Sequence, residues 1–333
     1  MQQFPNLDAL VFRSPASVRF PPKSEWFRAL LKRLIGRMNE FQFDPSDVLY
    51  ESLCASMASE SEDGQDECFF RIFPNLFDSD WSKAPYILLK QRVQHISHGT
   101  TGLSCWGASF ALANFFANSP YSVAFSNVSH ALELGAGCGL AGISFAASNA
   151  SAKVTLSDAH PDVLRQLREN VALNFDCSRN SRSAVSVERL DWTDFERRTL
   201  PKDAELIIAA DVTFDPSLFP PFAQLLRLLL CAESVPGGVV ALICCTVRDK
   251  STVDLFLRII ENHNISVRAQ YNCYFRNGIY GDQIAFVLRN FDGKMLYLSE
   301  NDPSQLNWFF SVFPNDLCSN FSFPVVIFEC VKC

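Results

Sequence analysis

Three glycines at alternate positions form the stretch whose spacing says most about chemistry. Gly135, Gly137 and Gly139 follow an apolar run that ends at Leu134, and a helical pattern begins after them. Glycine lets the backbone approach a ligand closely and adopt a positive φ without steric cost. The pattern predicts a strand, a tight turn and a helix N-terminus whose free N–H groups face a ligand. We therefore expect Gly135, Ala136 and Gly137 to contact a bound molecule.

The spacing of these glycines argues against a dinucleotide. The fingerprint G-x-G-x-x-G places its third glycine at the sixth position. Here the third glycine comes one residue earlier, at Gly139, and Leu140 occupies the sixth position. Glu133, two residues before Gly135, would also repel a phosphate. We expect the Glu133 carboxylate to accept a hydrogen bond from a ligand that has amino groups or positive charge.

Polar and aromatic side chains follow three further strand-like runs. Asp158, Asp191-Trp192 and Asp211 each stand where an apolar run ends. Because ligands of open parallel sheets bind outside the carboxyl ends of the strands, we expect these residues at one site. Asp158 can accept hydrogen bonds from a pair of ribose hydroxyls, and Asp191 can accept one from a purine amino group. Trp192 can stack on the base. Asp211 suits the reactive end, where a carboxylate can hold, orient or deprotonate an amine.

Each of these assignments has a structural alternative. Asp158 and Asp211 both precede helical patterns, so either can be a helix cap. Trp192 can be an ordinary buried side chain. Taken together, however, the residues specify an adenosine with a cationic, amino-bearing tail and no phosphate, a description that S-adenosylmethionine meets.

The elements that must position these residues alternate between strand and helix from residue 130 onward. Near-continuous apolar strands combined with amphipathic helices predict a mostly parallel sheet covered on both faces. The expected strands are 130–134, 154–158, 185–190, 206–210, 239–244 and 284–288, and the expected helices begin near 139, 161, 216 and 250.

The N-terminal part has a different pattern. Apolar residues at helical spacing predict helices from Ser24 and Ser46, and they form either a packing layer or a docking surface for a partner. Trp106 lies on the first turn of a helix after the glycine-containing loop 98–102. It is either a core residue or a wall of the ligand pocket.

Composition limits the partners and the location. The chain has 333 residues and a net charge of −7, which gives no electrostatic footprint for nucleic acid. The first twenty residues lack a signal-peptide pattern, and no apolar run is long enough to span a bilayer, so we expect no membrane partner and a cytoplasmic protein. The twelve cysteines are scattered and read as reduced thiols. The only CxxC, Cys330 to Cys333, has no second pair, so we expect no metal site.

The motifs resemble those of a known enzyme class. Residues Glu133 to Leu140, with Asp158, Leu190-Asp191-Trp192 and Ala209-Ala210-Asp211-Val212, resemble the seven-strand S-adenosylmethionine-dependent methyltransferases. The resemblance implies a Rossmann-like, mostly parallel α/β sheet and S-adenosylmethionine as cofactor. It also implies that the cofactor is lined by Trp106, Gly135 to Gly137, Asp158, Trp192 and Ala210.

A narrower resemblance concerns the substrate. Three stretches are similar to lysine methyltransferase family 16: His98 to Leu103 followed by Trp106, Ser157-Asp158 with Val163 to Val171, and the helical unit from Pro21 to Glu51. Within that family they are most similar to the branch that methylates a lysine of elongation factor 2. The resemblance implies transfer of a methyl group to a lysine ε-amine of a protein substrate, with Asp211 positioning the amine or relaying its proton.

The family pattern at Asp211 ends in tyrosine, whereas this chain has Asp211-Val-Thr-Phe214. Phe214 keeps the aromatic face and lacks the hydroxyl. The expected organisation is an N-terminal, mainly helical substrate or partner unit (1–95), a methyltransferase domain (96–292) and a C-terminal extension without an assigned role (293–333). A small-molecule methyltransferase and a non-catalytic protein-binding module that the cofactor stabilises remain alternatives.

Overall fold

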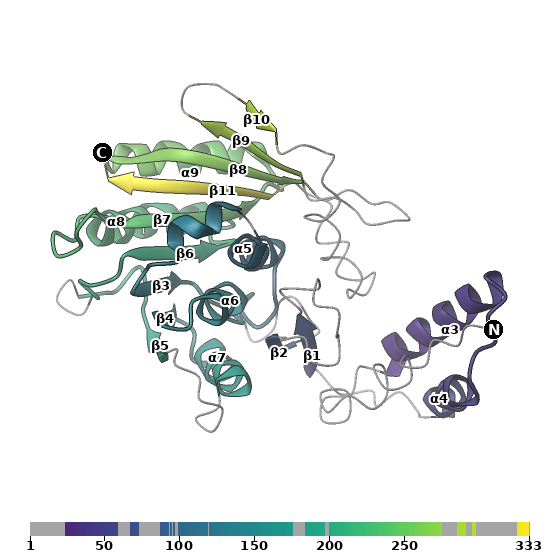
Figure 1. The fold of residues 1–333 in the computed structure, drawn as a ribbon. Coiled ribbons are helices and arrows are strands. Elements are labelled where there is room, and N and C mark those ends of the chain that lie inside the picture. The colour runs from purple at the N-terminus through teal and green to yellow at the C-terminus, as the bar shows by residue number, and fades with distance from the viewer. Residues whose placement is uncertain are drawn as a thin grey trace.

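A nine-stranded sheet organises the computed structural model of the chain (Figure 1). The structure describes residues 24–58, 67–72, 87–92, 94, 96, 99–118, 120–175, 184–196, 200–274, 285–290, 295–297 and 325–332, so His98 lies outside the described part. The strands run in the order β10-β9-β8-β11-β7-β6-β3-β4-β5. Their bounds are β3 His130–Leu134, β4 Lys153–Asp158, β5 Ala184–Arg189, β6 Leu206–Ala210, β7 Val240–Thr246, β8 Ile265–Tyr274, β9 Ala285–Asn290, β10 Met295–Tyr297 and β11 Val325–Lys332.

The centre of the sheet is parallel. β3 pairs with β4 and β6, β4 pairs with β5, and β6 pairs with β7, all in parallel register. β11 lies between β7 and β8 and is antiparallel to both. The seven strands β5, β4, β3, β6, β7, β11 and β8 therefore form the mostly parallel α/β sheet that the sequence predicts, and this prediction is confirmed.

β11 gives part of the C-terminal segment a definite place. Its first six residues are buried, and they continue the sheet between two strands more than fifty positions earlier in the sequence. Glu329 in β11 is paired with the guanidinium of Arg268 and accepts a hydrogen bond from Tyr271 Oη at 2.8 Å, both residues being on β8. Residues 325–332 thus share a sheet with the expected 96–292 domain rather than extending from it.

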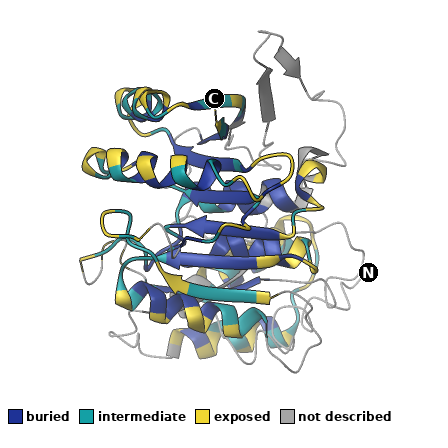
Figure 2. Ribbon diagram, turned by 90° about the vertical axis from the view of Figure 1, so that its left-hand side faces the viewer, coloured by how far each residue is buried: buried dark blue, intermediate teal, exposed yellow. Residues whose placement is uncertain are grey.

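Helices cover both faces of the sheet (Figure 2). Buried residues of α5, α6 and α7 form one apolar cluster with one face of the strands, and those of α8 and α9 form a second cluster with the other face. α7, α8 and α9 are amphipathic and turn their apolar sides inward, whereas α6 is buried over seven consecutive residues, 140–146. The bounds are α5 Gly107–Asn118, α6 Leu140–Ser148, α7 Pro161–Asn174, α8 Phe219–Leu230 and α9 Lys250–Asn262, with short 3-10 turns η1 Pro120–Phe125 and η4 Pro216–Leu218.

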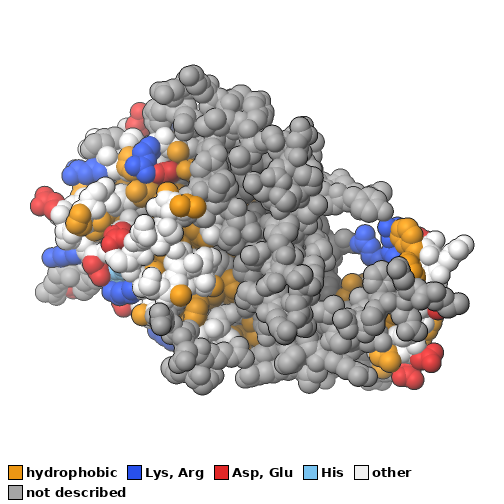
Figure 3. Space-filling view, in the orientation of Figure 1, with side chains coloured by type: hydrophobic (Ala, Val, Ile, Leu, Met, Phe, Trp, Pro, Cys, Tyr) orange, Lys and Arg blue, Asp and Glu red, His pale blue; other side chains and the backbone are white. Residues whose placement is uncertain are grey.

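The N-terminal helices begin where the sequence places them. α3 (Ser24–Glu40) and α4 (Asp47–Ala58) pack together around Leu31, Ile35 and Leu49. Figure 3 shows basic and hydrophobic side chains next to each other on the surface of this pair. In the described part of the chain, no helix has the length and apolarity needed to cross a membrane.

A hairpin follows these helices, and side-chain amides fix its second strand. β1 (Glu67–Ile72) pairs with β2 (Ile87–Arg92) in antiparallel register. The side-chain amides of Asn174 and Asn170 in α7 also bond the backbone of β2, as the backbone of a neighbouring strand would. The Asn174 amide bonds both backbone groups of Leu88, at 2.9 and 2.7 Å, and the Asn170 amide bonds both backbone groups of Lys90, at 2.8 and 3.0 Å.

Asn170 also connects the hairpin to the glycine turn. Its Nδ2 donates to the carbonyl oxygen of Cys138 at 2.9 Å, and the side chain is fully buried. One helical turn earlier, Gln166 Nε2 donates to the carbonyl of Leu103 at 3.1 Å. Residues 166, 170 and 174 therefore form an amide row on one face of α7 that holds β2, the loop after it and the glycine turn together.

We predict that Asn170→Leu destabilises the protein by about 2–5 kcal/mol, because it removes three hydrogen bonds that the fully buried Asn170 amide makes to the backbone of Lys90 and Cys138. Urea unfolding measures the loss. Glu169→Gln is the matched control: it removes an ion pair with Lys90 in which the glutamate side chain is 44% exposed, so we expect less than about 1 kcal/mol. Equal losses in the two variants would contradict the role of the amide row.

Candidate active site

A cavity of about 470 Å³ lies at the carboxyl ends of the central strands, beside the first turn of α5. Its walls come from the glycine turn, the segment from Thr100 to Trp106, and the residues after β4, β5, β6 and β7. Of the residues predicted from the sequence, the cavity is lined by Trp106, Gly135, Ala136, Gly137, Asp158, Asp191, Trp192, Ala210 and Asp211. Glu133 is not among the lining residues.

The glycine turn has the backbone geometry that only glycine adopts readily. The φ angles of Gly135, Gly137 and Gly139 are 65°, 55° and 84°. A Cβ on Gly135 would lie 2.8 Å from Cζ2 of Trp192, and a Cβ on Gly139 would lie 2.5 Å from a methyl of Leu167. The turn therefore needs glycine both for its conformation and for the close approach of its neighbours.

Glu133 serves the fold rather than the cavity, which corrects the prediction that its carboxylate contacts the ligand. Its side chain is 1% exposed, and Oε2 accepts a hydrogen bond at 2.9 Å from the N–H of Gly142 in α6. Burial raises the pKa of Glu133 to about 8; the Gly142 N–H opposes this rise, and the charge of Asp158 adds to it. The acid before the glycines thus ties β3 to α6.

Asp158 holds the turn and still faces the cavity. Its Oδ2 accepts from the N–H of Gly137 at 3.2 Å, and Oδ1 accepts from the N–H of His160 at 3.1 Å. Burial raises the pKa of Asp158, while these backbone N–H groups act in the opposite direction. The capping and ligand-binding interpretations are therefore compatible, and the cap of α7 itself is His160.

Asp191 and Trp192 form the next wall. Asp191 Oδ1 accepts from the N–H and the hydroxyl of Thr193, at 3.0 and 2.7 Å, and these bonds lower its pKa. Trp192 is half-buried and meets the ring of Phe222 edge to face, with centroids 4.9 Å apart. An apolar ring and a carboxylate thus stand side by side next to Gly135.

The Asp211 carboxylate accepts three hydrogen bonds and forms one ion pair. Oδ1 accepts from the N–H of Thr246 at 2.9 Å and lies 3.7 Å from Nη1 of Arg248. Oδ2 accepts from the hydroxyl of Thr246 at 2.9 Å and from the N–H of Ala108 at 3.4 Å. The residue has φ 53°, uncommon for a residue with a side chain. Three segments of the chain, at the ends of β6 and β7 and at the start of α5, therefore meet at the Asp211 carboxylate.

Asp211 is not the cap of the helix that follows it in sequence, which was the structural alternative. Asp215 caps that turn by accepting from the N–H of Ser217 at 2.9 Å. Asp211 instead bonds the first turn of α5, more than a hundred residues earlier.

The segment from Thr100 to Trp106 lies against the glycine turn. The carbonyl of Gly102 is 3.2 Å from where a Cβ of Gly137 would stand, so the two backbones touch. Trp106 Nε1 donates to the carbonyl of Thr101 at 3.0 Å, which fixes the indole ring beside the cavity. The interpretation of Trp106 as a pocket wall therefore agrees with its position.

Several residues that line the cavity were not predicted from the sequence. The rule that ligands meet the carboxyl ends of strands applies to β7 as well, and Arg248 lies two residues after that strand. His160 follows β4 in the same manner. Within the described residues, no cluster of three or more His, Cys, Asp or Glu side chains could hold a metal ion.

We predict that Glu133→Gln makes stability less sensitive to pH. The folded pKa of Glu133 lies above its ordinary value of 4.5, so the neutral carboxyl stabilises the fold fully below that pH, and this stabilisation is lost as the pH rises through about 8. Relative to wild type, Glu133→Gln should gain up to about 1.4 kcal/mol for each pH unit in this window.

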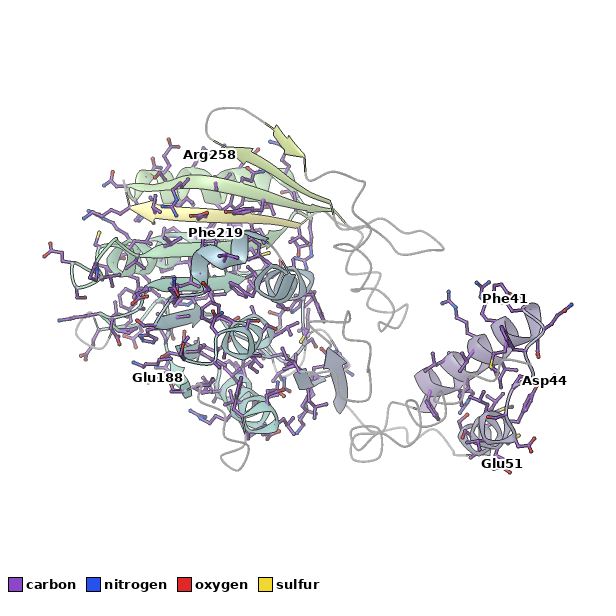
Figure 4. The ribbon with its side chains drawn as sticks, viewed as in Figure 1. Phe41, Asp44, Glu51, Glu188, Phe219 and Arg258 are labelled. Carbon is purple, nitrogen blue, oxygen red and sulfur yellow. The ribbon has the colours of Figure 1, made fainter. Side chains whose placement is uncertain are left out.

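Urea unfolding at pH 5.5 and pH 8 measures this trend. Glu188→Gln, on the outer strand β5 (Figure 4), is the control, since it makes the same substitution at an exposed carboxyl. A difference between Glu133→Gln and wild type that stays constant over this range would refute the buried-carboxyl interpretation.

Known proteins resemble this chain over most of its length. A family model described as lysine methyltransferase matches residues 89–263. The human putative protein N-methyltransferase FAM86B2 is 29% identical over 84% of this chain and 82% of its own length. The human protein-lysine N-methyltransferase EEF2KMT is 32% identical over 73% of this chain and 72% of its own. A calmodulin-lysine N-methyltransferase from Arabidopsis thaliana is 28% identical over 45% of this chain and 52% of its own.

The family match includes the glycine turn and the strand ends around the cavity. It agrees with the resemblance drawn from the motifs, and with S-adenosylmethionine as the cofactor. The chain belongs to the lysine methyltransferase family and is an S-adenosylmethionine-dependent protein-lysine N-methyltransferase.

Proposed function

We propose that this enzyme methylates a lysine of elongation factor 2 and that the cavity beside the glycine turn is its active site. The observation that supports the substrate most is the similarity to EEF2KMT, which recurs in the human, mouse and bovine proteins at 29–32% identity. The family alone does not specify the substrate, since a calmodulin-lysine methyltransferase also matches. The similarity to EEF2KMT covers a larger share of the chain.

The lining residues suit each part of S-adenosylmethionine. Trp192 offers an apolar ring to the adenine, and Asp191 beside it accepts hydrogen bonds. The Asp158 carboxylate is available to the ribose hydroxyls next to Gly137. In this proposal Ala210 and the glycine turn contact the cofactor through their backbones, and Trp106 closes the opposite wall.

The cofactor supplies a methyl group on a sulfonium, which is a good leaving group. The protein therefore has to align the lysine amine, exclude water and accommodate an uncharged nitrogen. Asp211 contributes by holding β7 and the N-terminus of α5 around the reacting end, through its hydrogen bonds to Thr246 and Ala108. We assign it a positioning role.

Phe214 stands where the family pattern has tyrosine. It lines the cavity, and 54% of its surface is exposed. An exposed ring at a cavity wall can pack against the methylene stem of an incoming lysine. Its position supports an apolar contact with the substrate side chain and requires no hydroxyl.

The N-terminal unit, residues 1–95, is in this proposal the docking surface for the protein substrate. Phe41, directly after α3, and Tyr50 and Met57 on α4 are exposed large apolar side chains. The guanidinium of Arg37 lies 5.1 Å from the ring centre of Phe41. Exposed apolar groups beside basic ones are typical of protein-binding surfaces. The division at residue 95 and the cytoplasmic location stay predictions.

We predict that Gly135→Ala weakens S-adenosylmethionine binding by about a hundredfold or more, because a Cβ there collides with Trp192 and strains a backbone at φ 65°. Isothermal titration calorimetry measures the loss. Gly237→Ala is the matched control, since Gly237 also has a positive φ, 88°, and a Cβ there meets open space. Binding by Gly135→Ala as tight as that by Gly237→Ala would contradict the cavity assignment.

We expect purified enzyme with tritiated S-adenosylmethionine to label elongation factor 2, both as the isolated protein and in a cell lysate. Amino-acid analysis of the labelled protein should yield methylated lysine. Labelling of a different protein band would contradict elongation factor 2 as the substrate and would still support protein methylation. Labelling confined to a small-molecule fraction would favour the metabolite methyltransferase, and no transfer despite tight cofactor binding would favour the binding module.

A further inference from the structure

Arg248 occupies a distinctive place at the cavity. It follows β7, lines the cavity, and its side chain is 38% exposed. Its Cζ lies 5.2 Å from the ring centre of Trp106, and its Nη1 lies 3.7 Å from Oδ1 of Asp211. The backbone N–H of Arg248 donates to the carbonyl of Thr246 at 3.0 Å, which fixes the start of the side chain. The guanidinium therefore stands between an aromatic wall and the buried carboxylate.

Arg248 is the single cation among the described residues that line the cavity. The titratable side chains that share this lining are three acids (Asp158, Asp191 and Asp211), one imidazole (His160) and two thiols (Cys105 and Cys138). Around Arg248 itself, Asp249 accepts from Ser251 and Thr252, Lys250 pairs with Asp254, and Asp215 accepts from Ser217, while α5 carries no charged residue. Without Arg248, no Lys or Arg of the described cavity lining would stand beside the charge of Asp211.

This arrangement bears on the protonation of the substrate. A lysine ammonium has no lone pair, so it must lose its proton to solvent before the nitrogen attacks. The nitrogen lone pair then forms the N–CH₃ bond while the S–CH₃ bond breaks and its electron pair stays on sulfur. An uncompensated carboxylate near the amine would stabilise the ammonium form and keep the nitrogen from reacting. A cation beside that carboxylate removes this effect.

We propose that Arg248 is a positioning residue that neutralises Asp211 and braces Trp106, so that the substrate lysine is held in the cavity as an uncharged amine. This inference rests on the cavity being the active site, as proposed above. It concerns the charge state of the substrate and is independent of which protein supplies the lysine.

The test is the pH dependence of methyl transfer between pH 6 and pH 10. Elongation factor 2 is the substrate or, if wild type does not label it, the lysate protein that wild type does label. For Arg248→Gln we expect the acidic limb of the rate profile to move by about one pH unit toward alkaline pH. The rate should fall about tenfold near neutral pH and recover as the amine deprotonates in bulk solvent.

Two further variants separate charge from structure. Arg248→Lys keeps a cation but loses the planar group that packs on Trp106. The acidic limb of its rate profile should therefore stay within about 0.3 pH units of wild type. Arg258→Gln, on the exposed side of α9 (Figure 4), removes an arginine away from the cavity and should not move the limb at all. Cofactor affinity, measured by calorimetry, should change less than about threefold in Arg248→Gln, which shows that the cavity is intact.

An unmoved limb in Arg248→Gln, with cofactor bound normally, would overturn the inference while leaving the proposed active site in place. An Arg248→Lys limb that moves as far as that of Arg248→Gln would also overturn it, because charge would then not be the cause. A separate result would contradict the proposed active site itself, namely unchanged cofactor affinity in Gly135→Ala.

Discussion

The hydrogen bonds to the Asp211 carboxylate hold one wall of the cavity together. They connect the end of β6 to the end of β7 through Thr246 and to the first turn of α5 through Ala108, and these partners are 35 and 103 positions away in the chain. A buried carboxylate without donors would be costly, so each partner must stay in place for the others to form. The positive φ of Asp211 persists because these bonds over-determine it.

The opposite side of the cavity depends on amides rather than on a charge. The row at positions 166, 170 and 174 of α7 bonds the backbone of β2, the loop after it and the glycine turn. Neutral amides can both donate and accept, so a single side chain satisfies both backbone groups of a strand residue. The N-terminal hairpin is therefore connected to the cavity through hydrogen bonds that end at Cys138, a residue of the cavity wall. A change in the hairpin has a direct physical route to the cavity.

Most of the candidate site could be predicted because ligands of parallel sheets bind at the carboxyl ends of the strands. Asp158, Trp192 and Asp211 stand where parallel strands end, and all three line the cavity. The prediction for Glu133 was wrong because this residue lies inside β3, where the alternation of side chains points it toward α6. Gly142 has no side chain and so leaves room for the Glu133 carboxylate there. The same rule, applied to β7, leads to Arg248. Its partners, Asp211 and the ring of Trp106, could not be inferred from local sequence.

The sequence by itself determined the alternation of strands and helices, the glycine turn and the identity of the cofactor. Each of these depends on residues within a few positions of one another, where periodicity and backbone preference act. The tertiary structure alone decided that Val325–Lys332 lies between β7 and β8, that Glu133 is buried, and that Arg248 meets Asp211. These features join segments far apart in the chain, and a pairing of that kind is set by how the whole core fills space, which no local pattern encodes.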